Sequence, residues 1–238
     1  MTGAAAERET RHGHARRVAL FGGSFDPIHT GHLAVARAAE RRFHLDEIHF
    51  IPSGRPPHKP GQHLAPYPHR FAMVALACAE HPRFVPSLAE AGRDLGGHET
   101  YYSIETVRHF RQQLRRFGDG LYFLVGADSF LEIPTWKDYE ALLLACNFIV
   151  ASRPGFRLEA LRLVIPPELR ARPHPAGSHP DPRAIELRRS MVYLLDAVES
   201  HISATEVRQR IARRQSIHGL VPASVEEYIC KQNLYRNP

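Results

Sequence analysis

The sequence contains little cysteine, a single tryptophan and no long hydrophobic run. Its cysteines are far apart and show no C-x-x-C spacing, so neither a disulfide framework nor a zinc site is indicated; they are Cys78, Cys146 and Cys230. This cysteine usage favours a reducing compartment, and we expect a cytoplasmic protein. The longest apolar run, residues 141–151, includes Asn147 and is too short to span a bilayer. Residues 1–17 lack the apolar core of a secretory signal, so we expect neither export nor membrane insertion.

Composition and charge indicate an ordinary globular chain with anionic partners. The 238 residues are 43% apolar and 24% charged, and we predict a flexible tail over 1–17 and one domain over 18–238. A stretch rich in proline suggests an irregular insertion at about 156–185. The formal charge of +6 favours anions, but the basic residues are scattered, which favours phosphorylated small molecules over nucleic acid. The sequence leaves the oligomeric state open, a homodimer included.

Short apolar runs alternate with amphipathic segments along most of the chain. The runs predict strands at residues 18–21, 47–51, 84–85, 121–125, 148–150 and 191–195. The amphipathic segments predict helices at about 31–43, 67–80, 104–114, 139–145, 202–211 and 222–233. Such alternation predicts an α/β fold with a doubly wound, mostly parallel sheet.

The segment VALFGGSFDPIHTGHL, residues 18–33, is the strongest functional signal. An apolar strand runs into Gly22-Gly23, where we expect a sharp turn, and a helix follows, so backbone N–H groups can meet a phosphate. His29 and His32 are three residues apart, which places both imidazoles on one helical face. Each feature alone has an ordinary structural explanation, and the chain contains 16 histidines. Neither G-x-G-x-x-G nor a P-loop is present in the segment.

Each of the other candidate residues has two interpretations, one structural and one as part of a binding site. Asp128 directly follows a predicted strand, where it can bind ribose hydroxyls or serve as a helix N-cap. His58 and Lys59 stand in a Pro-rich loop that follows another strand, and such a loop is either solvated or part of a site. Trp136 is a candidate for the core or for a ligand pocket.

The segment ISATEVR, residues 202–208, opens a predicted helix near the C-terminal end. Ser203 and Glu206 match an S-x-x-E capping box, which explains both without a ligand. Thr205 and Arg208 are not needed for the cap and lie in the first turn, where the helix dipole favours anions. We therefore expect a cap and a phosphate site together.

These motifs resemble those of a known family. GGSFDPIHTGH resembles the G-G-[ST]-F-D-P-x-H-x-G-H signature of the nucleotidyltransferase superfamily, and ISATEVR resembles the I-S-[SA]-T-x-[IVL]-R motif of its adenylyltransferases. PSGRPPHK, YYSIETV, the GADS-to-PTW block and SRPG resemble segments of bacterial nicotinate-nucleotide adenylyltransferases. The resemblance covers Val18 to about Tyr235. It departs in a longer loop at 90–100, an extension after Gly155, and Ser103 where the family usually has threonine.

The resemblance implies a Rossmann-like nucleotidyltransferase fold and a role in NAD biosynthesis. The implied reaction transfers AMP from ATP to nicotinate mononucleotide, giving deamido-NAD and pyrophosphate, with Mg²⁺ bound with ATP and no dedicated metal site. Alternatives are nicotinamide mononucleotide or pantetheine phosphate as the acceptor, or a non-catalytic nucleotide sensor.

The resemblance also implies roles for individual residues. His29 and His32 contact the triphosphate and act in catalysis. The implied ATP-binding residues are Gly22, Gly23, Ser24, Phe25, Asp128, Ser203, Thr205 and Arg208. The residues implied to bind nicotinate mononucleotide are His58, Lys59, Ser103, Trp136 and Arg153.

Overall fold

The computed structural model describes residues 15–54, 64–92, 95–96, 99–114, 118–172, 181–196 and 202–236. The strands in these ranges are β1 (Arg17–Gly23), β2 (Glu47–Pro52), β3 (Phe84–Pro86), β4 (Gly120–Gly126), β5 (Asn147–Ala151), β6 (Ala184–Glu186) and β7 (Met191–Leu195). The α-helices are α2 (Thr30–Phe43), α3 (Tyr67–Cys78), α4 (Ser103–Gln113), α5 (Ala127–Leu131), α6 (Tyr139–Ala145), α7 (Leu158–Leu163), α8 (Ala204–Ala212) and α9 (Ala223–Lys231). Two 3-10 turns are η1 (Ile133–Thr135) and η2 (Pro167–Leu169).

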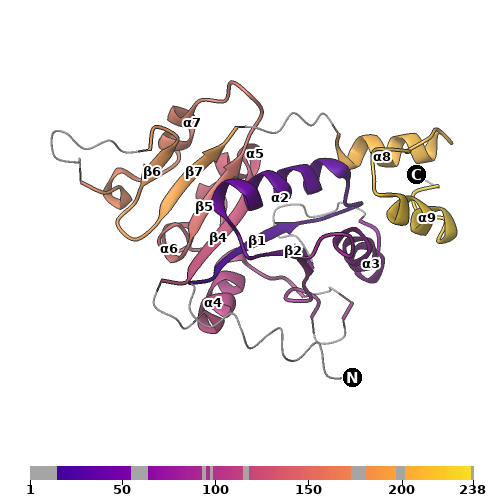
Figure 1. The fold of residues 1–238 in the computed structure, drawn as a ribbon, viewed down its shortest axis with the longest axis horizontal. Helices are drawn as coiled ribbons and strands as arrows, with labels where there is room; N and C mark the ends of the chain where they lie inside the picture. Colours follow the sequence, from indigo (N-terminus) through magenta and orange to yellow (C-terminus); the bar gives the residue numbers. More distant parts are fainter. Residues whose placement is uncertain are drawn as a thin grey trace.

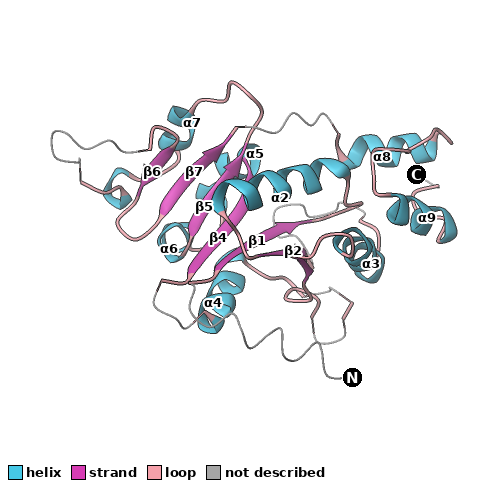
Figure 2. Cartoon of the chain, in the orientation of Figure 1, coloured by secondary structure: helices cyan, strands magenta, loops and turns pink. Residues whose placement is uncertain are grey.

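The described strands form one sheet with helices on both faces (Figures 1 and 2). Its order is β3-β2-β1-β4-β5-β7-β6, and every pair is parallel except β6 with β7. This arrangement confirms the predicted α/β class with a mostly parallel sheet. None of the described helices combines the length and hydrophobicity needed to cross a membrane.

The two faces of β1 contribute to two separate cores. Ala19 and Phe21 pack on one face with residues of α2, α3, α8 and α9, and Val18 and Leu20 pack on the other with residues of α4, α6 and α7. A strand that is covered on both faces must be apolar at every position, which explains its continuous hydrophobic run.

The chain winds in two directions from the middle of this sheet. From β1 it proceeds outward through β2 and β3, and it then returns to add β4 on the other side of β1. The order of strands therefore reverses between β1 and β4, and the carboxyl ends of these strands border the crevice in which open α/β sheets bind ligands. The signature residues 22–32 begin at this edge.

The fold differs from the sequence predictions at the start of β1 and in the predicted insertion. β1 begins at Arg17, inside the predicted tail, and the Arg16 guanidinium donates to Glu47 at 2.7 Å, so these residues belong to the folded part. The predicted irregular insertion contains α7, η2 and part of β6. With three residues each, η2 and β6 are too short to show a periodic pattern, and the six-residue helix α7 spans fewer than two helical turns.

Candidate active site

Gly22 and Gly23 are the last two residues of β1, so the chain does not turn there as the sequence predicted. They pair with Ile51 and Pro52 of β2, and neither has a positive φ angle. A Cβ atom on Gly23 would lie 3.3 Å from the Phe25 ring. Close packing against that ring, rather than turn formation, therefore explains the second glycine.

The chain turns instead at Phe25, whose φ angle is 45°. Its ring is 1% exposed and lies with its centroid 5.1 Å from that of His32 and 5.6 Å from that of Phe21. Phe25 was predicted to bind ATP, but the structure places its side chain in the core beneath His32. Only its backbone remains for direct contact with a ligand.

His29 and His32 come together at the start of α2. Their ring centroids are 3.7 Å apart, and the backbone N–H of His29 donates to Nδ1 of His32 at 3.2 Å. Removal of the rings from water lowers the pKa of His29 to about 4 and lowers the pKa of His32, to which the neighbouring His29 also contributes. Both rings are therefore neutral at pH 7. Because Nδ1 of His32 accepts, its single proton lies on Nε2, which is then a donor.

The beginning of α2 borders a cavity of about 600 Å³, here called the histidine cavity. The first turn of this 14-residue helix carries no acidic side chain, so its dipole favours an anion. Nδ1 of His29 is buried and has no hydrogen-bond partner among the described residues. The cavity is lined by Phe21, Gly22, Gly23, Ser24, His29, Gly31, His32, Val35, Gly126, Ala127, Asp128, Ser129, Ala151, Ser152, Arg153, Phe156 and Ile202.

A second cavity of about 200 Å³, the tryptophan cavity, lies next to the first. Trp136 is half-buried there and meets Phe123 edge-on, with ring centroids 6.0 Å apart. Ser103 is the first residue of α4, so the N-terminus of that helix faces this cavity. The remaining lining residues are Gly22, Gly23, Ser24, Ile51, Ser53, Glu90, Tyr101, Tyr102, Thr106, Val125, Ser129, Glu132 and Lys137.

The two cavities share the wall formed by Gly22, Gly23, Ser24 and Ser129. Two of these residues have no side chain and the other two have small ones. Ligands in the two cavities can therefore approach one another closely across this wall.

Asp128 and Arg153 both line the histidine cavity. Gly126 is the N-cap of α5 and Asp128 is its second residue, so the N-cap alternative for Asp128 is wrong. Arg153 was grouped with the pyridine nucleotide, whereas the structure places it with the histidines. The loop after β5 starts at the same edge of the sheet as the signature, which accounts for this position.

Ser203, Thr205 and Arg208 lie at the start of α8. The Ser203 hydroxyl accepts from the backbone N–H of Glu206 at 3.1 Å, but the Glu206 carboxylate pairs with Arg210, so only half of the predicted capping box forms. Arg208 donates to the carbonyl of Asp26 at 2.6 Å and to Thr205 Oγ1 at 3.3 Å. The histidine cavity reaches Ile202, and Arg208 is connected to the signature through Asp26.

His58 and Lys59 lie outside the described residues, and their predicted role stays a prediction. The structure adds two charged residues that the sequence analysis did not select. Arg70 is buried and donates to the carbonyls of Ser24 and Ser53 at 2.9 and 2.8 Å. A lone arginine at a buried position of the apolar helix α3 was the available signal.

Glu90 is the second missed residue and lines the tryptophan cavity. Thr106 Oγ1 donates to its carboxyl group at 3.0 Å. Burial raises the pKa of Glu90 to about 7, although hydrogen bonds from Thr106 and the Gly54 backbone and the charge of Arg70 act in the opposite direction. A single glutamate in a loop carries no sequence pattern that could have predicted its place in this cavity.

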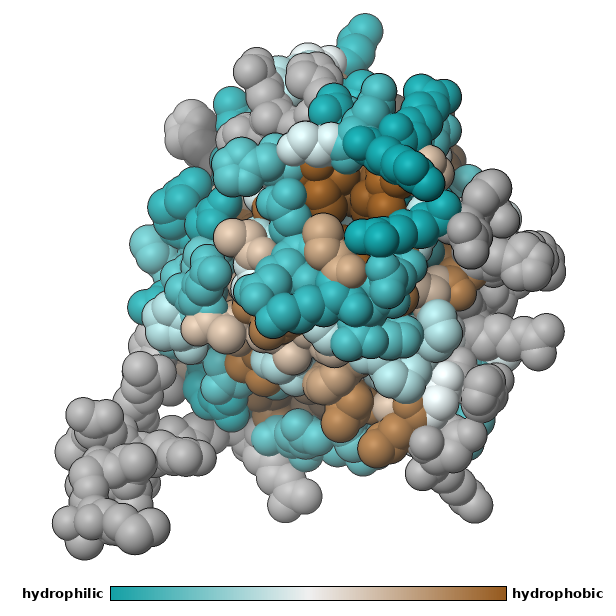
Figure 3. All heavy atoms as spheres, turned by 90° about the vertical axis from the view of Figure 1, so that its right-hand side faces the viewer, coloured by the Kyte–Doolittle hydropathy of each residue, from teal (hydrophilic) through white to brown (hydrophobic). Residues whose placement is uncertain are grey.

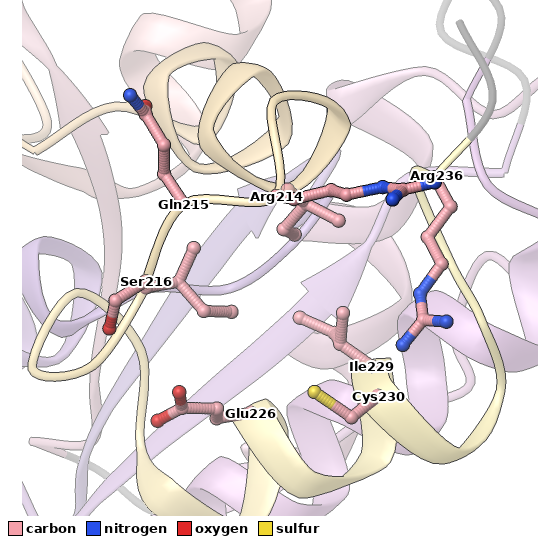
Figure 4. Close-up of a pocket in the computed structure, with 9 residues that line it drawn as sticks. Arg214, Gln215, Ser216, Glu226, Ile229, Cys230 and Arg236 are labelled. Carbon is pink, nitrogen blue, oxygen red and sulfur yellow. The ribbon is translucent and has the colours of Figure 1, made fainter.

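A separate hollow of about 660 Å³ lies in the C-terminal part of the chain. Figure 3 shows hydrophobic residues recessed among hydrophilic ones on the face that carries α8 and α9. Figure 4 draws Arg214 and Arg236 on the side of this hollow away from Glu226. Its lining residues all lie between Ile211 and Arg236 and include none of the signature, so the hollow is not part of the candidate site.

Comparisons with known proteins agree with this geometry. The cytidylyltransferase-like family model matches residues 20–210. A relative from Moorella thermoacetica, named "Probable nicotinate-nucleotide adenylyltransferase", is 41% identical, with 92% of each chain covered. The chain belongs to the nicotinate-nucleotide adenylyltransferase family. A second relative of this name, from Solibacter usitatus, is also 41% identical and is covered over 99% of its length.

A solved structure agrees with this adenylyltransferase fold. Nicotinic acid mononucleotide adenylyltransferase of Plasmodium falciparum, complexed with NaAD, aligns with a TM-score of 0.68 at 19% identity over 94% of this chain and 98% of that one. The family model and the two relatives confirm the family predicted from the end motifs together with the segments between them, and they confirm the enzyme class, a nucleotidyltransferase.

Proposed function

We propose that the two cavities bind the two substrates of one reaction, in which AMP passes from ATP to nicotinate mononucleotide and pyrophosphate leaves. The observation that carries this proposal is the shared wall of Gly22, Gly23, Ser24 and Ser129 at the switch point of the sheet. A direct transfer requires both reacting groups to meet, and a wall of small residues permits that contact.

The reaction needs positioning and charge stabilisation more than proton transfer. The 5′-phosphate of nicotinate mononucleotide is ionised at neutral pH and attacks the α-phosphorus of ATP, forming one P–O bond as the bond to pyrophosphate breaks. Nε2–H of His32 and the N-terminus of α2 are donors for the negative charge on the transferring group. Neutral imidazoles that are already in place need no reorganisation to donate.

The larger cavity suits ATP, with the phosphates at His29 and His32 and the ribose near Asp128. Ser203, Thr205 and Arg208 would hold the outer phosphates from the start of α8. The smaller cavity suits the pyridine, which stacks on Trp136 and directs its carboxylate toward the N-terminus of α4 at Ser103.

Mg²⁺ belongs to this proposal as a companion of ATP. The ion is commonly held by nucleotide phosphates and water together with few protein groups. Within the described ranges, no three His, Cys, Asp or Glu side chains gather to hold a metal. When bound, the ion would neutralise phosphate charge, while the histidines and Arg208 fix where the phosphates lie.

The deciding experiment measures pyrophosphate release from ATP in the presence of nicotinate mononucleotide, nicotinamide mononucleotide or pantetheine phosphate, each alone. We expect rapid release with the first compound and formation of deamido-NAD. Faster release with either of the other two would identify a different acceptor. ATP binding without turnover of any of the three would indicate a nucleotide sensor.

Replacing Arg208 with alanine should weaken ATP binding about tenfold or more, because a charge-assisted contact to phosphate is lost. The variant should also melt at a lower temperature, since Arg208 donates to the Asp26 carbonyl and faces its buried carboxylate at 3.7 Å. Calorimetric titration with ATP measures the first effect. Arg210→Ala is the matched control, because Arg210 lies on the same helix and pairs with Glu206. If the affinity for ATP is unchanged in Arg208→Ala, the Arg208 side chain has a structural role only.

Glu90 should make binding of nicotinate mononucleotide depend on pH. With a pKa raised to about 7, its carboxyl is neutral below that pH and negative above it, where it repels a substrate carboxylate in the same cavity. The KM for nicotinate mononucleotide should therefore rise about three- to tenfold between pH 6 and pH 8. Glu90→Gln should remove this rise, and an identical pH profile in that variant would show that another group causes it.

A further inference from the structure

Asp26 is a buried carboxylate within the signature and is 1% exposed. Its Oδ1 atom accepts from the backbone N–H of Ala65 at 3.1 Å and from the hydroxyl of Tyr235 at 2.6 Å. Its Oδ2 atom has no hydrogen bond from the described residues and lies 3.7 Å from Nη1 of Arg208. Two donors on one oxygen fix the rotation of the carboxylate, and the other oxygen then faces the arginine.

Tyr235 is held firmly in the position from which it donates. Its ring packs against the core cluster that contains Phe25 and Val207. The backbone of Tyr235 has a φ angle of 61°, which is unusual for a residue other than glycine and persists only where surrounding contacts require it. Burial and then the Asp26 carboxylate raise the pKa of Tyr235, so the hydroxyl keeps its proton at neutral pH.

Arg208 is the group that this arrangement controls. One of its nitrogens donates to the Asp26 carbonyl at 2.6 Å and the other to Thr205 Oγ1 at 3.3 Å, while its side chain remains 26% exposed. The guanidinium is thus anchored along one edge and accessible elsewhere. Its direction depends on where the backbone and the carboxylate of Asp26 lie.

We propose that Tyr235 is a positioning residue for ATP: its hydroxyl fixes Asp26, and Asp26 holds Arg208 in the direction required to bind phosphate. This inference rests on the proposed function, which assigns Arg208 to the outer phosphates. Tyr235 itself contacts no substrate in this arrangement, and its effect passes through Arg208.

Tyr235→Phe tests the proposal because it removes one oxygen atom and keeps the ring. We expect the KM for ATP to rise about tenfold or more, the scale for loss of a hydrogen bond to a charged group, with the KM for nicotinate mononucleotide changed less than about twofold. The control is Tyr228→Phe, which removes a hydroxyl that bonds His69 at 2.9 Å in the same part of the chain. Tyr228→Phe should leave both KM values within about twofold, and melting curves establish that each variant is folded.

A double-mutant cycle separates action through Arg208 from a general loss of packing. In an Arg208→Ala background, Tyr235→Phe should raise the KM for ATP by less than about twofold, because the guanidinium through which Tyr235 acts is already absent. Full additivity of the two substitutions would overturn the proposal. An unchanged KM for ATP in Tyr235→Phe alone would overturn it as well.

The same variants distinguish failure of this inference from failure of the proposed function. If the parent protein forms no deamido-NAD, the proposed function fails, and the cycle is measured as equilibrium ATP binding by calorimetry. If the parent turns over normally but the cycle is additive, only the role of Tyr235 fails. If Arg208→Ala leaves ATP binding unchanged, the assignment of Arg208 fails and this inference fails with it.

Discussion

Replacing His32 with alanine is expected to lower kcat by about 10²–10³-fold, the scale for removing one preorganised donor to a developing charge. The ring of His32 is supported by Phe25, stacked on His29 and oriented by the His29 backbone N–H. The Nε2–H group is therefore already held in a fixed direction when AMP is transferred from ATP. Since the interaction strengthens as charge develops, the KM values should change much less than kcat.

Two further substitutions sharpen this test. His32→Asn keeps an acceptor near the position of Nδ1 for the His29 N–H but loses the distal donor, so it should show a similar loss of kcat. His218→Ala is the control, because the side chain of His218 is 86% exposed and lies away from both cavities. Steady-state kinetics that place kcat of His32→Ala within about threefold of the parent would contradict the assigned role.

The parent enzyme should prefer nicotinate mononucleotide to nicotinamide mononucleotide by about ten- to ten-thousand-fold in kcat/KM. The carboxylate and the amide have nearly the same shape but differ in charge and in two N–H donors. The tryptophan cavity presents the Ser103 hydroxyl and the N-terminus of α4, which are donors that suit the carboxylate. The amide would place its own donors against them, and an unpaired buried polar group is costly.

Variants of the two pocket residues separate selectivity from stacking. Trp136→Ala should raise KM for both nucleotides by similar factors, because an aromatic face does not distinguish acid from amide. Ser103→Ala should reduce kcat/KM for the acid more than for the amide. Equal kcat/KM for the two nucleotides in the parent would contradict a cavity lined with donors.

Most of the strands and helices, and the family, were predictable from sequence because local patterns determine them. The helix α6 was predicted with its observed ends, and the strand β7 likewise, since each has a full apolar period and clear boundaries. The two end motifs also located the histidines that come together at α2. In each of these cases, residues close in sequence carry the information.

The rest of the site depends on contacts that the sequence does not display. The turn at Phe25 was assigned to the glycines because a phenylalanine with positive φ is uncommon, and tertiary packing overrode that preference. The Glu206 carboxylate was expected at the cap, but Arg210 one turn later binds it. Glu90 lines the tryptophan cavity and accepts from Thr106, which is sixteen residues away, so only the folded chain brings the two together.

The hydrogen bond between Asp26 and Tyr235 joins residues 209 positions apart. It can therefore form only late in translation, long after the signature has been made. A ribosome makes the signature early, yet one donor to its buried carboxylate is added only when residue 235 has been translated. Nascent chains stopped before residue 223 also lack α9, whose Val225 and Ile229 belong to the same core as Phe25. Incomplete chains would thus carry the histidines but lack one donor to Asp26, and we expect them to bind ATP more weakly than the finished chain.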